Sequence, residues 1–139
     1  FQGYVANSTG VILGFGPSAI STLPQGYAQN LHEPGAWAKA IENEKLPIAR
    51  GHRLSADDCA RRDIIERLMC DLTADLTPLG GARACARELG ALAALADNGL
   101  VVVDGDHLTI PPHARQFCRL AAQAFDAYAH APSRHSGAV

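Results

Sequence analysis

The stretch best suited to chemistry is Gly14-Phe15-Gly16-Pro17-Ser18-Ala19, which fits the pattern G-x-G-x-x-A. That pattern forms the phosphate-binding turn of dinucleotide-binding folds when a strand precedes it and a helix opens at it. Here Pro17 follows the second glycine, and Leu23-Pro24-Gln25-Gly26 interrupts any helix soon afterwards. The dinucleotide interpretation is therefore disfavoured. Two interpretations stay open: a glycine-rich strand end without a ligand, and a strand end whose glycines let a ligand approach the backbone closely.

A second candidate is the charged segment RGHRLSADDCARRDII, residues 50–65. Its alternating charges favour local ion pairs at a solvated helix start, each of which contributes well under about 1 kcal/mol. The alternative is that Arg61 and Arg62 clamp a carboxylate. The pattern alone favours the local ion pairs.

The spacing of residues does not indicate a nucleophilic, acid–base or metal site. No Ser-His-Asp, Cys-His or paired-carboxylate arrangement stands out. No two cysteines have a C-x-x-C spacing, and the histidines form no H-x-x-x-H pair. We therefore predict no catalytic residue and no metal ligand in this chain. We expect reduced thiols in a cytoplasmic protein at Cys59, Cys70, Cys85 and Cys118.

Composition narrows the class of protein. The chain has 139 residues, 47% of them hydrophobic and 6% aromatic, and a formal net charge of −2. One domain of this length can bury a core, and the near-neutral charge gives no general attraction to nucleic acid or to anionic membranes. No apolar run reaches the roughly 18 residues of a membrane helix, and no signal peptide is recognised. Because the chain begins with Phe1 rather than Met, we expect that a segment upstream is missing.

The elements that must position the glycine stretch lie in residues 1–50. Val11-Ile12-Leu13 is continuously apolar, as in a strand buried on both faces inside a larger sheet. Residues 36–43 predict one short helix, and Pro47 ends the segment. One such strand cannot build a sheet alone, so these fifty residues are predicted to be the remnant of one.

Residues 55–130 give more regular signals. Ser55-Ala56-Asp57-Asp58 predicts a capping box at a helix start. The elements expected after it are an apolar helix face through Leu72, a short helix from Thr77-Pro78, a helix over residues 82–97 stopped by Asn98-Gly99, a hairpin at Asp104-Gly105, and a last helix after Pro111-Pro112. This order is typical of a winged-helix module.

Winged helices usually bind DNA through one helix and the hairpin. The candidate recognition helix offers Arg83 and Arg87 but also acids, and the hairpin tip carries Asp104 and Asp106. Because phosphate contacts dominate such binding, an acidic tip argues against it. A stand-alone winged-helix binding module is kept as the alternative function.

Several segments, in order, carry a resemblance to a known family. They are FQGY, VILGFGPSAIS, GYAQN, LPIARGHRLSADDCARRDIIERLMC, LADNGLVVVDGDHLTI and FDAY. This set closely resembles the C-terminal part of oxygen-independent coproporphyrinogen III oxidases, which are radical S-adenosylmethionine enzymes of haem biosynthesis. The match spans nearly the whole chain.

The resemblance implies a partial α/β barrel capped by a helical domain. It implies oxidative decarboxylation of coproporphyrinogen III to protoporphyrinogen IX, with S-adenosylmethionine and a four-iron-four-sulfur cluster. The family's CxxxCxxC cluster motif is absent here, so we expect this segment alone to be inactive, to bind no cluster and to bind S-adenosylmethionine weakly at best. One family ligand carries over: Ile20 of the SAIS motif would contact S-adenosylmethionine, with Gly16, Ser18 and Ala19 lining the same wall.

The resemblance has one departure. Residues 71–89 are shorter than the family pattern and contain no aromatic residue, which puts the substrate in doubt. The predicted fold is α+β and mainly helical. Residues 1–50 form the remnant of the last barrel strand with a connecting segment, residues 51–131 the winged-helix-like domain, and residues 132–139 a flexible tail. We expect a porphyrinogen substrate in the full-length enzyme, no nucleic-acid or membrane partner, and a homodimer through the orphan strand at residues 11–16.

Overall fold

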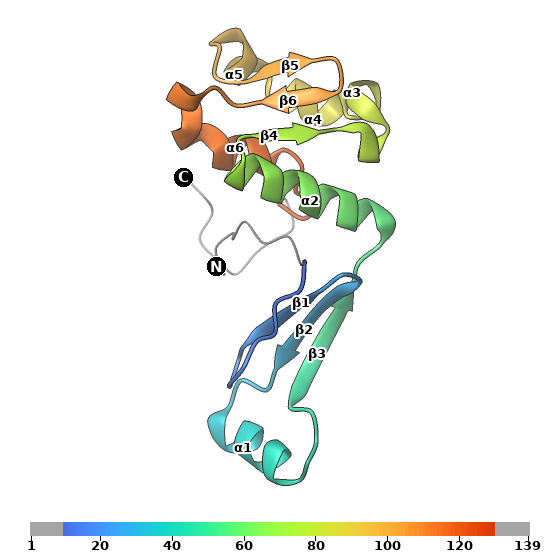
Figure 1. The fold of residues 1–139 in the computed structure, drawn as a ribbon, viewed down its shortest axis with the longest axis vertical. Helices are drawn as coiled ribbons and strands as arrows, with labels where there is room; N and C mark the ends of the chain where they lie inside the picture. The colour runs from blue at the N-terminus through green and yellow to red at the C-terminus, as the bar shows by residue number, and fades with distance from the viewer. Residues whose placement is uncertain (1–9, 130–139) are drawn as a thin grey trace. The chain divides into compact units, whose positions relative to one another are not determined.

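The computed structural model describes residues 10–129, which divide into two compact units after Cys59 (Figure 1). We call residues 10–59 the N-terminal unit and residues 60–129 the C-terminal unit. The predicted boundary between residues 50 and 51 falls inside a strand of the N-terminal unit. The predicted tail at residues 132–139 lies outside the described residues.

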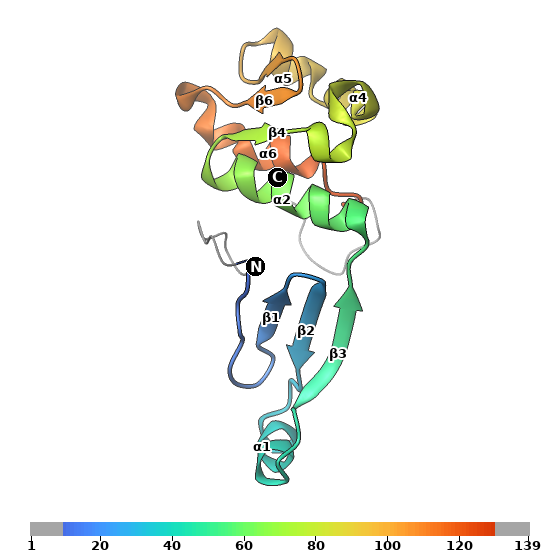
Figure 2. The same ribbon diagram turned by 45° about the vertical axis from the view of Figure 1, so that its right-hand side comes forward.

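The N-terminal unit is an antiparallel sheet of three strands in the order β1-β2-β3, with one helix inserted between the last two. Figure 2 shows the strands side by side, with the helix beyond their ends. The elements are β1 (Ile20–Leu23), β2 (Gly26–Asn30), α1 (Pro34–Glu42) and β3 (Ile48–Arg53). None of the three strands was predicted, because the short hairpin turn at Pro24-Gln25 was interpreted only as a helix breaker.

Helix α1 confirms the prediction of a short helix over residues 36–43. Pro34 takes its first position, where a missing N–H costs nothing. Glu33 precedes it as the N-cap, and its Oε2 accepts a hydrogen bond from the Ala36 N–H at 2.6 Å. A residue of the HEPG turn therefore starts this helix.

The prediction of a buried strand at Val11-Ile12-Leu13 is wrong. Ile12 makes a single antiparallel bridge, its N–H to the Thr22 carbonyl at 2.9 Å and its carbonyl to the Thr22 N–H at 2.8 Å. The exposed fractions are 38% for Val11, 42% for Ile12 and 61% for Leu13. Burial on both faces requires a layer on each side, and the N-terminal unit supplies neither.

The C-terminal unit combines helices with a second three-stranded antiparallel sheet, of order β4-β6-β5. Helix α2 (Ala56–Cys70) enters it from the capping box. Asp58 N–H donates to Ser55 Oγ at 3.1 Å, and Ser55 N–H donates to Asp58 Oδ2 at 2.9 Å, as predicted. The elements that follow are β4 (Thr73–Asp75), η1 (Thr77–Leu79), α3 (Gly81–Ala84), α4 (Ala86–Ala91), α5 (Ala93–Asp97), β5 (Val102–Asp104), β6 (His107–Thr109), η2 (Pro112–Phe117) and α6 (Cys118–Gln123).

Several predictions for this unit need correction in detail. The helix expected over residues 82–97 is three short helices, broken at Cys85 and Leu92, whose side chains both enter the core. The last helix begins as the 3₁₀ helix η2 before it becomes α6. The hairpin at Asp104-Gly105 is confirmed, with Asp104 opposite His107. Strand β4 was not predicted because it has only three residues.

The core of the described residues lies in the C-terminal unit. Within residues 10–129, all buried hydrophobic residues lie between Ile64 and Phe125. The side chains of Leu68 on α2, Leu108 on β6 and Phe125 after α6 have no exposed surface. One helix, one strand and the C-terminal segment therefore meet in a common interior.

The hairpin tip is fastened to the start of α3. Asp106 Oδ1 accepts a hydrogen bond from the Ala82 N–H at 2.7 Å, and the Asp106 carbonyl accepts from the Leu76 N–H at 2.8 Å. Asp106 is therefore engaged within the unit through both its carboxylate and its carbonyl.

Candidate functional site

The predicted site residues lie together in one turn, which we call the glycine turn (residues 14–20). Gly16, Ala19 and Ile20 are half-buried and Ser18 is exposed. Ile20 begins β1, so its backbone is fixed by pairing with Gln29 of β2. The Ser18 N–H donates to the Leu31 carbonyl at 2.9 Å. The four residues named from the family resemblance thus form one continuous surface feature.

The turn requires glycine at positions 14 and 16 for different structural reasons. A Cβ on Gly14 would lie 2.7 Å from the Ile20 carbonyl oxygen, so the chain's own backbone requires glycine there. Gly16 has φ +98, which L side chains rarely adopt, and a Cβ on it would meet nothing within 4 Å. At Gly14, therefore, the group that approaches the backbone closely is the chain's own Ile20 carbonyl and not a ligand. At Gly16 the space beside the backbone is open.

Asn30 holds the turn closed, a role that sequence reasoning missed. Its side-chain Nδ2 donates to the Gly16 carbonyl at 2.9 Å and to the Gly14 carbonyl at 3.3 Å. Its backbone N–H donates to the Ala19 carbonyl at 2.9 Å. Asn30 comes sixteen residues after Gly14, so only the hairpin between them, which was not predicted, could have revealed this contact. The turn is held by three bonds from one residue.

A polar chain runs across the sheet to the same turn. Arg50 Nε donates to Gln29 Oε1 at 2.8 Å, and Gln29 Nε2 donates to the Ser18 carbonyl at 3.2 Å. Ser18 has a φ of 62, a value uncommon for residues other than glycine. The contact from Gln29 therefore stabilises the least favourable backbone position of the turn.

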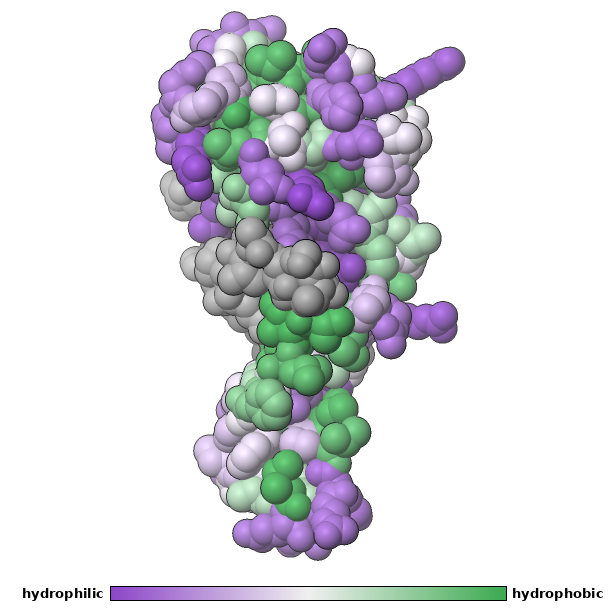
Figure 3. Space-filling model, in the orientation of Figure 1, coloured by the Kyte–Doolittle hydropathy of each residue, from purple (hydrophilic) through white to green (hydrophobic). Residues whose placement is uncertain are grey.

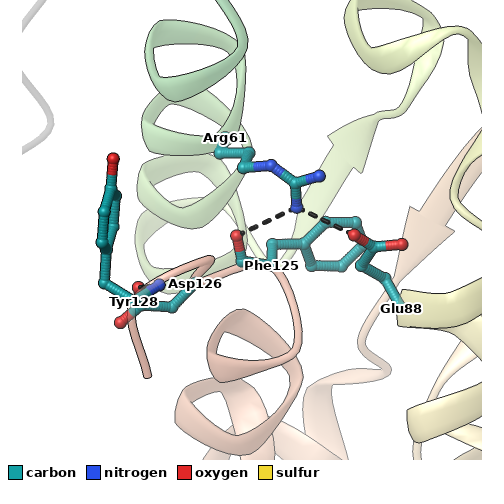
Figure 4. Close-up of polar contacts among 5 residues, drawn as sticks. All are labelled: Arg61, Glu88, Phe125, Asp126 and Tyr128. Atoms are coloured by element: carbon teal, nitrogen blue, oxygen red, sulfur yellow. Dashed lines mark hydrogen bonds and ion pairs between the residues drawn. The ribbon is translucent and has the colours of Figure 1, made fainter. Parts of the chain in front are cut away.

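The second candidate, Arg61, engages a carboxylate of the protein itself. Its Nη1 lies 2.9 Å from Glu88 Oε1 on α4 and 3.4 Å from the Phe125 carbonyl oxygen (Figure 4). The two side chains are 21% and 12% exposed. Partial burial alone would raise the pKa of Glu88. The hydrogen bond of Arg61, a backbone hydrogen bond and the charges of Arg61 and Arg87 together outweigh the burial, so the pKa is lowered. This ion pair joins segments far apart in sequence.

Arg62 behaves as the local interpretation predicts. Its Nε lies 3.4 Å from Oδ1 of the adjacent Asp63, whose side chain is 67% exposed. The ion pair of Arg62 with Asp63 is thus separate from the ion pair of Arg61 with Glu88.

A cavity of about 520 Å³ opens beside the Arg61–Glu88 pair. Its walls combine charged and aliphatic side chains, among them Arg87, Leu92, Leu95, Leu120 and Asp126. Two arginines and two acids balance in charge, and no nucleophile beside a base is among the lining residues. We interpret the pair as a structural link between α2, α4 and the end of α6.

Metal ligands do not gather within residues 10–129, where no group of three His, Cys, Asp or Glu side chains is placed to hold an ion. All four cysteines are free thiols, and Cys85 is buried. No helix in the same range is long and apolar enough to cross a membrane.

Comparison with known proteins shows what this arrangement belongs to. No protein-family model matches the chain. The chain is 44% identical over 133 residues to the oxygen-independent coproporphyrinogen III oxidase of Bradyrhizobium diazoefficiens, covering 92% of this chain and 30% of that protein. It is 35% identical over 140 residues to the enzyme of the same name from Escherichia coli strain K12, covering 96% of this chain and 31% of that protein.

The solved structures agree with the sequence comparison. The structure of coproporphyrinogen III oxidase from Escherichia coli, a radical SAM enzyme, matches with a TM-score of 0.80 at 34% identity, over 91% of this chain and 31% of that one. The chain belongs to the oxygen-independent coproporphyrinogen III oxidase family and corresponds to its C-terminal portion. It spans about a third of the length of the curated relatives it matches.

Proposed function

We propose that this chain is the C-terminal portion of an enzyme that converts coproporphyrinogen III to protoporphyrinogen IX by oxidative decarboxylation. The observation that carries the proposal is the agreement of sequence and fold over nearly the whole chain with coproporphyrinogen III oxidases. The glycine turn supports it, because the residues predicted to contact the ligand are already held in place by hydrogen bonds within the chain.

In this proposal the glycine turn forms one wall of the S-adenosylmethionine site. Ile20 packs as an apolar surface against the adenosyl group, and Gly16, Ser18 and Ala19 line the same wall. The half-buried Ile20 at a strand start and the open space at Gly16 fit this role. S-adenosylmethionine supplies the radical chemistry when bound, and this chain's residues only bind and orient it.

The four-iron-four-sulfur cluster does not fit the residues described here. The described part of the chain offers no set of three metal ligands. We therefore assign no step through the cluster to residues 10–129 and propose that the isolated chain is inactive.

The finer fold follows from the same proposal. We propose that α2, β4, α3 to α5, β5 and β6 form a winged helix that serves as a structural module; their order is the one expected of that fold. Val11-Ile12-Leu13 would become a strand of the partial barrel when further strands flank it. The engaged Asp106 and the broken helix over residues 81–97 support a role other than DNA binding.

The test is a chimera in which this chain replaces the matching C-terminal third of the Escherichia coli enzyme. We expect the chimera, loaded with its cluster, to form protoporphyrinogen IX from coproporphyrinogen III, whereas the isolated chain forms none. A folded, cluster-loaded chimera without activity would refute the proposed function. In that case the shortened residues 71–89 would be the first segment to examine.

We also propose that the isolated chain forms a homodimer through the exposed segment at residues 11–16. Exposed strand edges recruit other strands, and Phe15 in this segment is 88% exposed. Size-exclusion chromatography at several concentrations should show a shift toward the dimer.

We also propose a cytoplasmic location, since all four cysteines are free thiols. Gel-shift assays with duplex DNA at low salt should show no binding.

A further inference from the structure

Ile20, Gln29 and Arg50 stand in one row across the three strands of the N-terminal unit. Ile20 is opposite Gln29 in the β1–β2 pair, and Gln29 is opposite Arg50 in the β2–β3 pair. Residues directly opposite in antiparallel strands share a sheet face, and the bond from Arg50 Nε to Gln29 Oε1 confirms it for the last two. The residue proposed to contact the adenosyl group therefore has an arginine on its own face.

The spacing suits a ligand that touches both ends of this row. Neighbouring strands lie about 4.8 Å apart, so the backbones of Ile20 and Arg50 are separated by about 10 Å. Both S-adenosylmethionine and a porphyrinogen are long enough to touch both ends of this row.

The charges of the sheet favour an anion. Strands β1, β2 and β3 contain no Asp or Glu, whereas β3 carries Arg50 and Arg53. The exposed Arg50 uses Nε to bind Gln29, and within residues 10–129 its Nη atoms have no hydrogen-bond or ion-pair partner. The guanidinium is thus fixed along one edge while its terminal donors face solvent, the arrangement that bidentate binding of a carboxylate requires.

We infer that Arg50 binds a carboxylate of a ligand that lies against the sheet face shared with Ile20, and that Gln29 is a positioning residue for that guanidinium. This inference rests on the proposed function only for the contact at Ile20. Two ligands of the proposed reaction carry the chemistry: the methionine carboxylate of S-adenosylmethionine and the propionates of the porphyrinogen.

The experiment is an NMR titration of the whole chain, observing the Arg50 Nε–H and the Ile20 methyl groups. One pair of probes is S-adenosylmethionine and 5′-methylthioadenosine, which lacks the carboxylate. The other pair is coproporphyrin III, a stable stand-in for the porphyrinogen, and its uncharged tetraamide. Arg50→Gln is compared with Arg53→Gln, which removes an exposed arginine from the opposite face of the same strand. Retained β1–β3 amide shifts establish that each variant is folded.

We expect Arg50→Gln to weaken binding of one carboxylate probe by about tenfold or more, the effect of one charge-assisted hydrogen-bonded contact. Its uncharged counterpart should bind equally to both proteins, and Arg53→Gln should match the unsubstituted chain. Arg50→Lys should give an intermediate loss, because it keeps the charge without the planar fork. A loss confined to S-adenosylmethionine identifies the methionine carboxylate, and a loss confined to coproporphyrin identifies a propionate.

Two results would overturn the inference. One is equal weakening by Arg50→Gln and Arg53→Gln, which would mean a non-specific charge effect. The other is an Arg50 Nε–H signal that no carboxylate probe moves. A failure of the proposed cofactor wall has a different signature: the Ile20 methyl signals would then not respond to 5′-methylthioadenosine.

Discussion

The two units of the chain differ most in how they bury apolar side chains. The C-terminal unit holds all the buried hydrophobic residues of the described chain, with Phe125, Leu68 and Leu108 fully enclosed. In residues 10–59 the only residues classed as buried are Gly26 and Pro47. Figure 3 shows hydrophobic residues on the surface of the N-terminal unit. The large hydrophobic residues exposed in this unit are Val11, Ile12, Leu13, Phe15, Ile41, Leu46 and Ile48.

This difference separates a unit that stabilises itself from one that is ordered mainly by polar contacts. Hydrophobic burial provides most of the favourable free energy of folding. The N-terminal unit instead relies on strand pairing and on the bonds that Asn30 and Gln29 make to the glycine turn. Such a sheet is well suited to a role inside a larger enzyme, whose other parts would cover its apolar side chains.

The largest effect should come from a matched pair of phenylalanines. Phe125→Ala should destabilise the C-terminal unit by about 3–5 kcal/mol, because it leaves a cavity in a closed core. Phe15→Ala should change the unfolding free energy by less than about 0.5 kcal/mol, because Phe15 is 88% exposed. Urea unfolding followed by circular dichroism measures both. Similar losses for the two variants would remove the distinction between the units.

The hairpin tip offers a smaller effect within the C-terminal unit. Asp106→Ala should cost about 1–2 kcal/mol, as expected for the loss of a helix-capping carboxylate. The matched variant Asp104→Ala should have little effect, because the Ala82 N–H is bound by Asp106. Thermal unfolding of the two variants compares them. Equal stability would mean that the contact to Ala82 contributes nothing measurable.

The Arg61–Glu88 pair predicts a dependence on pH. Because the folded pKa of Glu88 is lowered from its ordinary 4.5, the carboxylate contributes stability above about pH 4.5. That stability is lost as the pH falls through the lower folded pKa. Glu88→Gln should therefore cost about 1 kcal/mol at pH 7 and should reduce the loss of stability on acidification. Unfolding curves between pH 7 and pH 3 provide the check, and an unchanged slope in the variant would contradict the assignment.

The smallest effect on stability is expected at the exposed apolar segment of the N-terminal unit. The double variant Val11→Thr and Leu13→Thr should change the unfolding free energy by less than about 0.5 kcal/mol. It should nevertheless reduce self-association, because it removes apolar surface beside a strand edge. Size-exclusion chromatography at high concentration tests this expectation, and a dimer that persists unchanged would exclude residues 11–16 as its interface.

Local signals in the sequence predicted helix α2 and the C-terminal unit better than the sheet of the N-terminal unit. The capping box at Ser55 and the hairpin at Asp104-Gly105 depend on neighbouring residues only, and both are confirmed. The strands β1 to β3 were missed because their residues are mixed in polarity. The turn at Pro24-Gln25 between β1 and β2 was interpreted only as a helix breaker, and β3 pairs with β2 across the inserted helix. The bonds of Asn30 to the glycine turn depend on the same pairing. The contact of Ile20 with S-adenosylmethionine stays a prediction.

Hydrogen exchange measured on the isolated chain and on the Escherichia coli chimera tests the central claim most directly. If the N-terminal unit completes a larger enzyme, amides of β1, β2 and β3 should exchange at least about tenfold more slowly in the chimera, a change of about 1.4 kcal/mol in opening free energy. Amides of α2, β6 and α6 should exchange at the same rate in both proteins. Unchanged exchange in the three strands of an active chimera would contradict the account.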